Sequence, residues 1–475
     1  MRLLKAFSKY AIGTAFVLLI GFITTPILTR LISTTEMGKY SMFMTFGNLI
    51  STLLCFGMDQ SYLRFFYAES KESRTYLLRR CMVIPFWAFL TCSMIILVLY
   101  GPISVYLAGE RSMAIAGLFI AYVGGMIIDR FWSLKIQMVQ KEIAYSALNF
   151  IRKLGYLVVA VFLILVVGRW QDGTNLMIAI TAAEVFVLLF ARIVERGDWK
   201  IRKKEIHESY HELLQYGLPF VFSSTITLIF HSTDKIMLKA LSDYHNIGIY
   251  SGAQNIVNLL SQAQAVFVAF WVPTVYEHYE KNKEDSTFYV LMNKIVSYAM
   301  LMILIALICM KDFVVLLLGE EYRDACNVFP FLAFMPVMYT ISETTVMGIN
   351  FMKKTGYHLY ISMISMLVNA FGNFVFITMY GAKGAAIATG LSYSVFFILR
   401  TYFSNKVFPV PYAWKRYGVA ALLVYFLAFY ASFYPVTGFF ILLAVIVVAV
   451  ITFLYRDIII QGGKMLAEFI RIRRM

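Results

Sequence analysis

The sequence predicts an all-α integral membrane protein with about 14 transmembrane helices, arranged as two six-helix bundles in parallel repeat plus two C-terminal helices. Three observations support this fold class: long apolar runs, basic residues gathered in alternate connections, and an internal repeat. Hydrophobic residues make up 60% of the chain and charged residues 15%, whereas a soluble domain has roughly 25% charged residues. This composition excludes a water-soluble protein and favours one that lies in a bilayer.

The apolar runs predict the helices in order. A span needs about 20 mostly apolar residues, and such runs lie near 10–31, 40–58, 81–101, 112–128, 151–168, 175–192, 213–238, 247–273, 292–310, 325–345, 357–379, 384–403, 415–432 and 437–455. We interpret the first run as a retained helix rather than a cleaved signal peptide, because it is long enough to span the membrane. Pro435 and Gly438 predict a turn between the last two runs.

Basic residues predict the orientation of these helices. Cytoplasmic connections of membrane proteins are enriched in Lys and Arg. With the N-terminus inside, 33 of the 42 Lys and Arg residues lie in inner segments. We therefore expect a multi-pass protein of the cytoplasmic (inner) membrane with both termini in the cytoplasm. The net charge of +15 is concentrated in clusters such as 202–204 and 471–474, which suits anionic membrane lipids better than nucleic acid.

An internal repeat lies at an offset of 210 residues. Leu28, Leu31, Gly38, Tyr40, Ser41, Asn48, Leu49 and Ser51 match Leu238, Leu241, Gly248, Tyr250, Ser251, Asn258, Leu259 and Ser261. The offset spans six helices, an even number, so both halves have the same orientation, as in parallel-repeat transporters. We expect a first bundle at 1–194, a basic cytoplasmic linker at 195–212, a second bundle at 213–405, and helices 13 and 14 with a basic cytoplasmic tail at 406–475.

Polar residues recur at steps of three or four on one face of three predicted helices. The sets are Ser41, Thr45, Asn48, Thr52, Cys55 and Asp59 in the second helix, Gln254, Asn255, Asn258, Ser261, Gln262 and Gln264 in the eighth, and His358, Ser362, Ser365, Asn369 and Asn373 in the eleventh. Such stripes either form hydrogen bonds between helices, worth about 1–2 kcal/mol or less each, or line a water-filled cavity. We favour the cavity for the eighth helix and leave both interpretations open for the eleventh.

Ionisable residues within apolar runs are candidate functional groups, because a charge at mid-bilayer costs roughly 2.5–3.5 kcal/mol on insertion scales. The seventh helix has His231, Asp234, Lys235 and Lys239 on one face, and Arg30 and Lys39 lie near the outer ends of the first two helices. Glu184 and Glu343 are lone acids near membrane depth, while Asp59 and Arg64 flank the inner end of the second helix. Asp234 and Lys235 form either a local ion pair or a ligand site, and each lone acid either binds a proton or cation or pairs with a basic neighbour.

Several motifs of enzymes and metal sites are missing from the sequence. It has no G-x-x-x-x-G-K-[ST] loop and no Cys/His zinc spacing. The five cysteines form no C-x-x-C pair, and four lie within apolar runs. The longest outer connection, 311–323, is too short for a catalytic domain. We therefore expect neither an enzyme nor a bound cofactor, and leave coupling to protons or Na⁺ open.

Short motifs in both halves resemble a known family. They are T-P-I-L-T-R-L-I at 25–32, G-K-Y-S at 38–41, Y-G-L-P-F at 216–220, D-K-I-M-L at 234–238, G-I-Y-S-G-A at 248–253 and W-V-P at 271–273. With them the chain resembles the polysaccharide or oligosaccharide flippases of the multidrug/oligosaccharidyl-lipid/polysaccharide exporter superfamily. The resemblance in organisation covers the whole chain, but the motifs identify no substrate.

The resemblance implies an alternating-access machine that moves a polyprenyl-diphosphate-linked oligosaccharide from the cytoplasmic to the outer leaflet. Its partners would include the lipid-linked oligosaccharide and, for polymer assembly, a polysaccharide polymerase and glycosyltransferases. Lys235, Lys239, Arg30, Lys39 and Arg64 would contact the phosphates, and Asn48, Gln254, Asn258 and Gln262 the sugars. Asp234, His231, Glu184, Glu343 and Asp59 would be candidates for ion coupling.

The first helix lacks the arginine cluster that diphosphate capture there would need. A cation-coupled exporter of drugs or other small molecules could have the same fold, but it would be expected to have acids deep in its N-terminal half. A membrane enzyme and a non-transporting scaffold of glycan assembly are the two remaining interpretations of the sequence.

Overall fold

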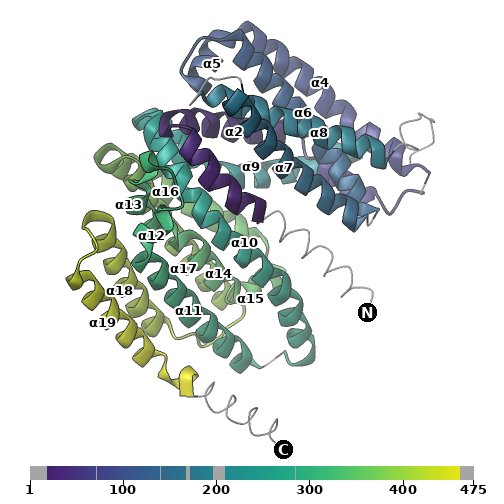
Figure 1. The fold of residues 1–475 in the computed structure, drawn as a ribbon. Coiled ribbons are helices and arrows are strands. Elements are labelled where there is room, and N and C mark those ends of the chain that lie inside the picture. The colour runs from purple at the N-terminus through teal and green to yellow at the C-terminus, as the bar shows by residue number, and fades with distance from the viewer. Residues whose placement is uncertain are drawn as a thin grey trace, which may run out of the picture. The chain divides into compact units, whose positions relative to one another are not determined.

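The computed structural model describes residues 19–70, 72–139, 141–166, 172–195, 209–283 and 285–460, and every regular element among them is a helix (Figure 1). Eleven of these helices are long and apolar enough to cross a membrane, and the bent pair α2 and α3 makes a twelfth span. Two shorter apolar helices, Leu19–Leu31 and Gly438–Leu454, correspond to the first and last predicted spans. The expected all-α membrane fold with about 14 helices is confirmed.

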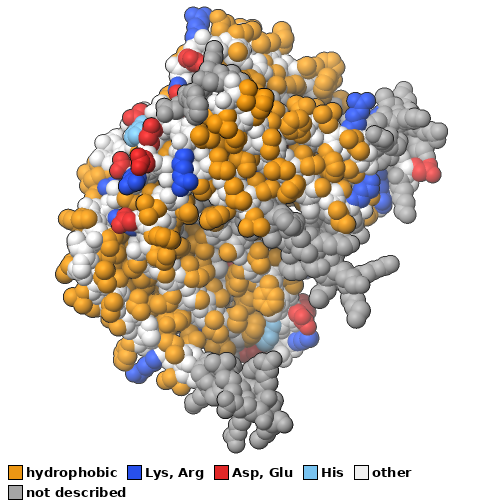
Figure 2. Space-filling model, in the orientation of Figure 1, with side chains coloured by type: hydrophobic (Ala, Val, Ile, Leu, Met, Phe, Trp, Pro, Cys, Tyr) orange, Lys and Arg blue, Asp and Glu red, His pale blue; other side chains and the backbone are white. Residues whose placement is uncertain are grey.

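Contacts divide the chain into two compact units, residues 1–239 with 243–248, and residues 240–242 with 249–475. The first unit contains the helix Leu19–Leu31, α2 (Thr34–Leu54), α3 (Met58–Phe65), α4 (Arg74–Val98), α5 (Tyr100–Ala108), α6 (Met113–Met138), α7 (Glu142–Val166), α8 (Gly173–Val194) and most of α9 (Tyr210–Leu241). Its interior lies where α2, α6, α7 and α8 pack together. Hydrophobic side chains cover most of the face seen in Figure 2, as expected for contact with lipid.

The second unit begins within α10 (Tyr244–Lys281) and continues through α11 (Ser286–Cys309), α12 (Lys311–Val315), the 3₁₀ helix η2 (Glu320–Tyr322), α13 (Ala325–Leu332), α14 (Phe334–Glu343), α15 (Met347–Phe351), α16 (Gly356–Tyr380), α17 (Ala382–Val407), α18 (Trp414–Phe433) and α19 (Gly438–Leu454). Helices α16 and α17 form a tight hairpin, because Gly384 lets the backbone approach the carbonyl of Phe376. The tenth predicted span consists of α13 and α14, which meet at Ala333.

An ion-pair cluster ties α18 and the segment that follows α19 to α11. Asp457 accepts hydrogen bonds from Lys294 at 3.0 Å and from Arg416 at 2.7 Å. Partial burial alone would raise the pKa of Asp457, but the hydrogen bonds and charges of its two basic partners outweigh burial and lower it. The two C-terminal helices are thus attached to the second unit.

The seventh predicted helix is α9, and most of it belongs to the first unit. Residues 210–239 have their contacts in the first unit. There the Ser61 hydroxyl donates a hydrogen bond of 2.6 Å to the Leu213 carbonyl. A Cβ atom on Gly217 would lie 2.6 Å from the carbonyl oxygen of Gly57, so two glycines allow this close backbone approach. The division into six and six helices remains a prediction.

The break in the second predicted helix lies at this same contact. Helices α2 and α3 are bent by 56°, and Phe56 and Gly57 between them have φ values of 48° and 69°. Gly57 tolerates this left-handed conformation, whereas for Phe56 it is unfavourable. Asp59 therefore lies in the separate short helix α3 instead of continuing the polar stripe of α2.

The glycine of each G-x-Y-S motif contacts the backbone of a residue four positions before the other glycine, within the first unit. A Cβ atom on Gly38 would lie 1.9 Å from the carbonyl oxygen of Tyr244, and one on Gly248 would lie 1.8 Å from that of Thr34. Each residue of one contact is 210 positions from its counterpart in the other, so the contact is reciprocal, as between subunits related by a two-fold axis. This geometry supports the parallel repeat. The Thr34 side chain adds a 2.6 Å hydrogen bond to His245.

Candidate functional site

The structure distributes the predicted site residues between the two units. Arg30, Lys39, Asn48, Asp59, Arg64, Glu184, His231, Asp234, Lys235 and Lys239 belong to the first unit, and Gln254, Asn258, Gln262 and Glu343 belong to the second.

The amide face of α10 is defined by Gln254, Asn258 and Gln262, spaced four residues apart. Asn258 and Gln262 are exposed and Gln254 is half-buried. Gln254 lies ten residues from the start of α10, roughly 15 Å along the axis, and Gln262 is roughly 12 Å further on. Within the described part of the chain, none of these three amides has a hydrogen-bond partner, whereas the Thr274 hydroxyl on the same helix bonds to the Phe270 carbonyl. The amide face therefore needs water or a polar ligand.

The charged face of α9 has two kinds of cation. Lys235 is half-buried and interacts electrostatically with buried Asp234, but forms no hydrogen bond or ion pair with any described residue. Lys239 lies 3.4 Å from the ring centroid of Tyr244, where the aromatic face stabilises its charge. His231 is exposed on the same helix. Lys235 is thus the cation of this face with unused hydrogen-bonding capacity.

The predicted cations of the first two helices have local roles. Lys39 forms a 2.6 Å ion pair with Glu36, whose second oxygen accepts a 2.8 Å hydrogen bond from the Gly173 amide. Arg30 is exposed, and Arg64 is exposed beside the ring of Phe65. These contacts do not bring the three cations together into one cluster.

Two buried acids of the first unit, Asp59 and Glu184, are paired with arginines. Asp59, only 3% exposed, accepts hydrogen bonds from the Arg130 guanidinium at 2.8 and 2.9 Å. Glu184, 5% exposed, lies 3.3 Å from Nε of Arg152, which also binds Asp129. Helix α7 thus supplies a basic neighbour for Glu184, which is one of the two alternatives that the sequence left open.

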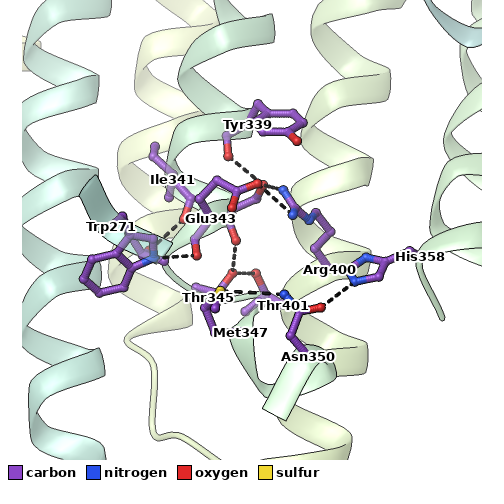
Figure 3. A network of polar contacts seen from close by, with 12 residues as sticks. Trp271, Tyr339, Ile341, Glu343, Thr345, Met347, Asn350, His358, Arg400 and Thr401 are labelled. Carbon is purple, nitrogen blue, oxygen red and sulfur yellow. Dashed lines mark hydrogen bonds and ion pairs between the residues drawn. The ribbon is translucent and has the colours of Figure 1, made fainter. Parts of the chain in front are cut away.

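Glu343 also has a basic partner, again one of the two alternatives that the sequence left open. Its carboxylate lies 2.8 Å from Arg400 of α17 (Figure 3). Arg400 also donates a 2.6 Å hydrogen bond to Ser342. The Trp271 indole donates to the backbone carbonyl of Glu343 at 3.0 Å. Tyr339 packs against the guanidinium, 5.0 Å from ring centroid to Cζ. Glu343 and Arg400 thus form a balanced, buried ion pair that ties α14 to α17.

The other polar stripes are mostly satisfied within the protein. In α16, Asn373 donates a 3.1 Å hydrogen bond to Asn369, and both side chains are buried. In α2, the Thr45 hydroxyl bonds to the Ser41 carbonyl at 2.7 Å, and the Asn48 amide to the Met44 carbonyl at 2.8 Å. These contacts favour packing for α2 and α16.

Sequence reasoning missed Arg152 and Arg400, the partners of the two supposedly lone acids. Both residues interrupt predicted apolar runs, at 151–168 and 384–403. A basic residue at that depth indicates a nearby acid, so the signal was present in the sequence. The choice of acid depends on helix packing.

Comparison with known proteins agrees with this fold. The family model described as "Polysaccharide biosynthesis protein" matches residues 3–278. The chain is 22% identical over 451 residues to an uncharacterised membrane protein of Methanocaldococcus jannaschii, covering 86% of this chain and 87% of the relative. It is also 22% identical over 437 residues to the probable low-salt glycan biosynthesis flippase Agl15 of Haloferax volcanii, covering 88% and 87%.

Solved structures with similar folds include two transporter types. The inward closed conformation of the lipid II flippase MurJ aligns with a TM-score of 0.66 and 14% identity, covering 95% of this chain and 99% of that one. An inward-facing multidrug resistance MATE transporter aligns with a TM-score of 0.55 and 14% identity, covering 83% and 94%. The family match spans more than half of the residues. The chain therefore belongs to the polysaccharide biosynthesis protein family.

Proposed function

We propose that the protein is a flippase that moves a polyprenyl-diphosphate-linked oligosaccharide from the inner to the outer leaflet of the cytoplasmic membrane by alternating access. Two relatives support this proposal, the probable glycan biosynthesis flippase and the lipid II flippase. A sugar head group needs hydrogen-bonding partners within the membrane, while its lipid tail remains in the bilayer.

The observation that carries the proposal is the amide face of α10. A polar group left without a hydrogen bond in an apolar medium costs on the order of several kcal/mol, so three amides facing lipid would strongly disfavour the fold. Facing a water-filled path, Gln254, Asn258 and Gln262 keep their hydrogen bonds to water and can exchange them for sugar hydroxyls. An amide both donates and accepts, which suits a hydroxyl-rich cargo without selecting one sugar.

The phosphates of the cargo need positive charge as well. Lys235 fits this role because its three donors have no hydrogen bond or ion pair with a described residue. A lysine ammonium is a compact point charge that can contact phosphate oxygens from several directions.

The test replaces the amide face in cells that depend on this protein for surface polysaccharide. The triple variant Gln254→Leu, Asn258→Leu and Gln262→Leu should lose export and accumulate the lipid-linked oligosaccharide, at normal abundance in the membrane. Thr274→Val is the matched control, since its hydroxyl is already bonded to its own helix. Wild-type export by the triple variant would overturn the proposal. Unchanged glycan export with altered drug resistance would favour the small-molecule exporter instead.

A labelling experiment tests whether the amide face is wet. In a background without the five native cysteines, single cysteines at Gln254, Asn258 and Ser261 should react with a polar thiol reagent. Cysteines at Ile256 and Leu260 should react far less. Equal reaction of both sets would mean that the face does not border water.

A further inference from the structure

Three charged side chains from three helices meet inside the first unit. Asp129 of α6 accepts an ion-pair hydrogen bond from Arg152 of α7, and the Arg152 Nε lies 3.3 Å from Glu184 Oε1 of α8. The carboxylates are well buried, with side-chain exposures of 13% for Asp129 and 6% for Glu184. One arginine thus serves two acids.

The charges of this cluster do not balance when both acids are ionised. Two carboxylates and one guanidinium leave one net negative charge, and a buried uncompensated charge is strongly unfavourable. The buried carboxylates of Asp59 and Glu343 are each matched with one base, Arg130 and Arg400 respectively. The cluster of Asp129, Arg152 and Glu184 is therefore short of one positive charge, whereas those two pairs are balanced.

Neighbouring titratable groups do not remove this deficit. Tyr122 of α6 is near Glu184, and Tyr156 of α7 stacks on Tyr40 of α2, but neutral phenols supply no positive charge. Lys153 follows Arg152 in α7, yet it is exposed and its electrostatic neighbour is Arg152 rather than either acid. Arg130 is bound to Asp59.

One oxygen of the cluster is free to take a proton. Oδ1 of Asp129 accepts a 2.9 Å hydrogen bond from Ser133, and Oδ2 is bound to Arg152. Oε2 of Glu184, in contrast, is buried without a hydrogen-bond partner. Among the described residues, no group of three or more His, Cys, Asp or Glu side chains is arranged to hold a metal ion. A proton is thus favoured over a metal ion as the missing charge.

We infer that Glu184 is a proton-binding site of the first unit, with Arg152 and Asp129 as its positioning residues. Protonation at Oε2 makes the carboxyl neutral and leaves Asp129 and Arg152 as a balanced pair. The binding of a proton at Glu184 does not depend on the proposed flippase function. Only the use of that proton to drive transport rests on it.

The test measures the protonated carboxyl directly in the full-length protein, reconstituted in liposomes without any glycan. Infrared difference spectra between neutral and alkaline pH should show the loss of a buried carboxylic acid band. Glu184→Gln should remove this band, while Glu320→Gln, a control at a side chain 92% exposed, should leave it. Because no transport is measured, the result does not depend on whether the protein flips lipids.

Asp129→Asn gives a second arm that keeps Glu184 itself. With one acid gone, Arg152 neutralises Glu184 alone, so the band should disappear at a pH lower by about one unit or more. An unchanged band in Glu184→Gln, or an unchanged titration in Asp129→Asn, would overturn the proposal. Loss of the band at constant pH on adding Na⁺ would also overturn it, because a metal ion would then occupy the site.

Discussion

The reciprocal glycine contact between the repeats predicts a measurable opening when either glycine gains a side chain. In Gly38→Ala the new Cβ would lie 1.9 Å from the Tyr244 carbonyl oxygen, and ordinary contact begins at 3.4 Å. The two helix ends must therefore separate by roughly 1.5 Å, because the clashing atom belongs to the backbone and cannot rotate away. Gly248→Ala should act alike, since its Cβ would lie 1.8 Å from the Thr34 carbonyl oxygen.

The energetic cost follows from the hydrogen bonds beside the contact. Separation breaks the 2.6 Å bond between Thr34 and His245 and strains the 3.0 Å bonds from the Tyr244 hydroxyl to α5. With about 1 kcal/mol net for each of the two groups, the closed contact loses about 2 kcal/mol. That loss makes the open state roughly 30-fold more populated.

The assay is the rate at which a polar thiol reagent modifies Met37→Cys in a protein without native cysteines. Met37 is 4% exposed, so modification reports opening. The rate should rise roughly 30-fold with Gly38→Ala, consistent with the population shift. Gly117→Ala is the control, because a Cβ there meets nothing within 4 Å. Equal rates in the two variants would refute the reasoning.

Three further predictions concern charge and topology. If Lys235 binds the cargo, Lys235→Ala should abolish glycan export while the protein keeps its normal abundance in the membrane, and Lys235→Arg should retain part of the export. The double variant Lys235→Ala with Asp234→Ala should stay inactive. Full activity of this double variant would instead indicate a structural ion pair. Glu343→Gln should lower the free energy of unfolding by about 3–5 kcal/mol, because Arg400 stays buried without its counter-ion. Thermal unfolding checks this, and adding Arg400→Met should recover stability; equal stability of single and double variants would contradict it. Reporter fusions at Gly173, Asp243 and Thr437 should all give an external signal. A cytoplasmic signal at any of these sites would contradict the predicted topology.

The sequence alone determined the features that depend on periodicity and composition. The apolar runs identified the spans, including the bent one at 40–58, because each helix needs about 20 mostly apolar residues to cross the bilayer. The repeat at an offset of 210 residues was visible in the sequence, and the reciprocal contacts of Gly38 with Tyr244 and of Gly248 with Thr34 support it. The amides of α10 were likewise identified from their four-residue spacing.

Tertiary structure decided which buried groups meet. Arg400 lies 57 residues from Glu343, and Arg152 binds acids on two other helices. Helical spacing defines the face on which a side chain lies, but not which helix packs against that face. The same limit explains α9, whose contacts with the first unit depend on the close approach of Gly57 and Gly217. Local periodicity therefore fixed the helices and the amide face, whereas the charge balance around Glu184 became visible only when three helices were packed together.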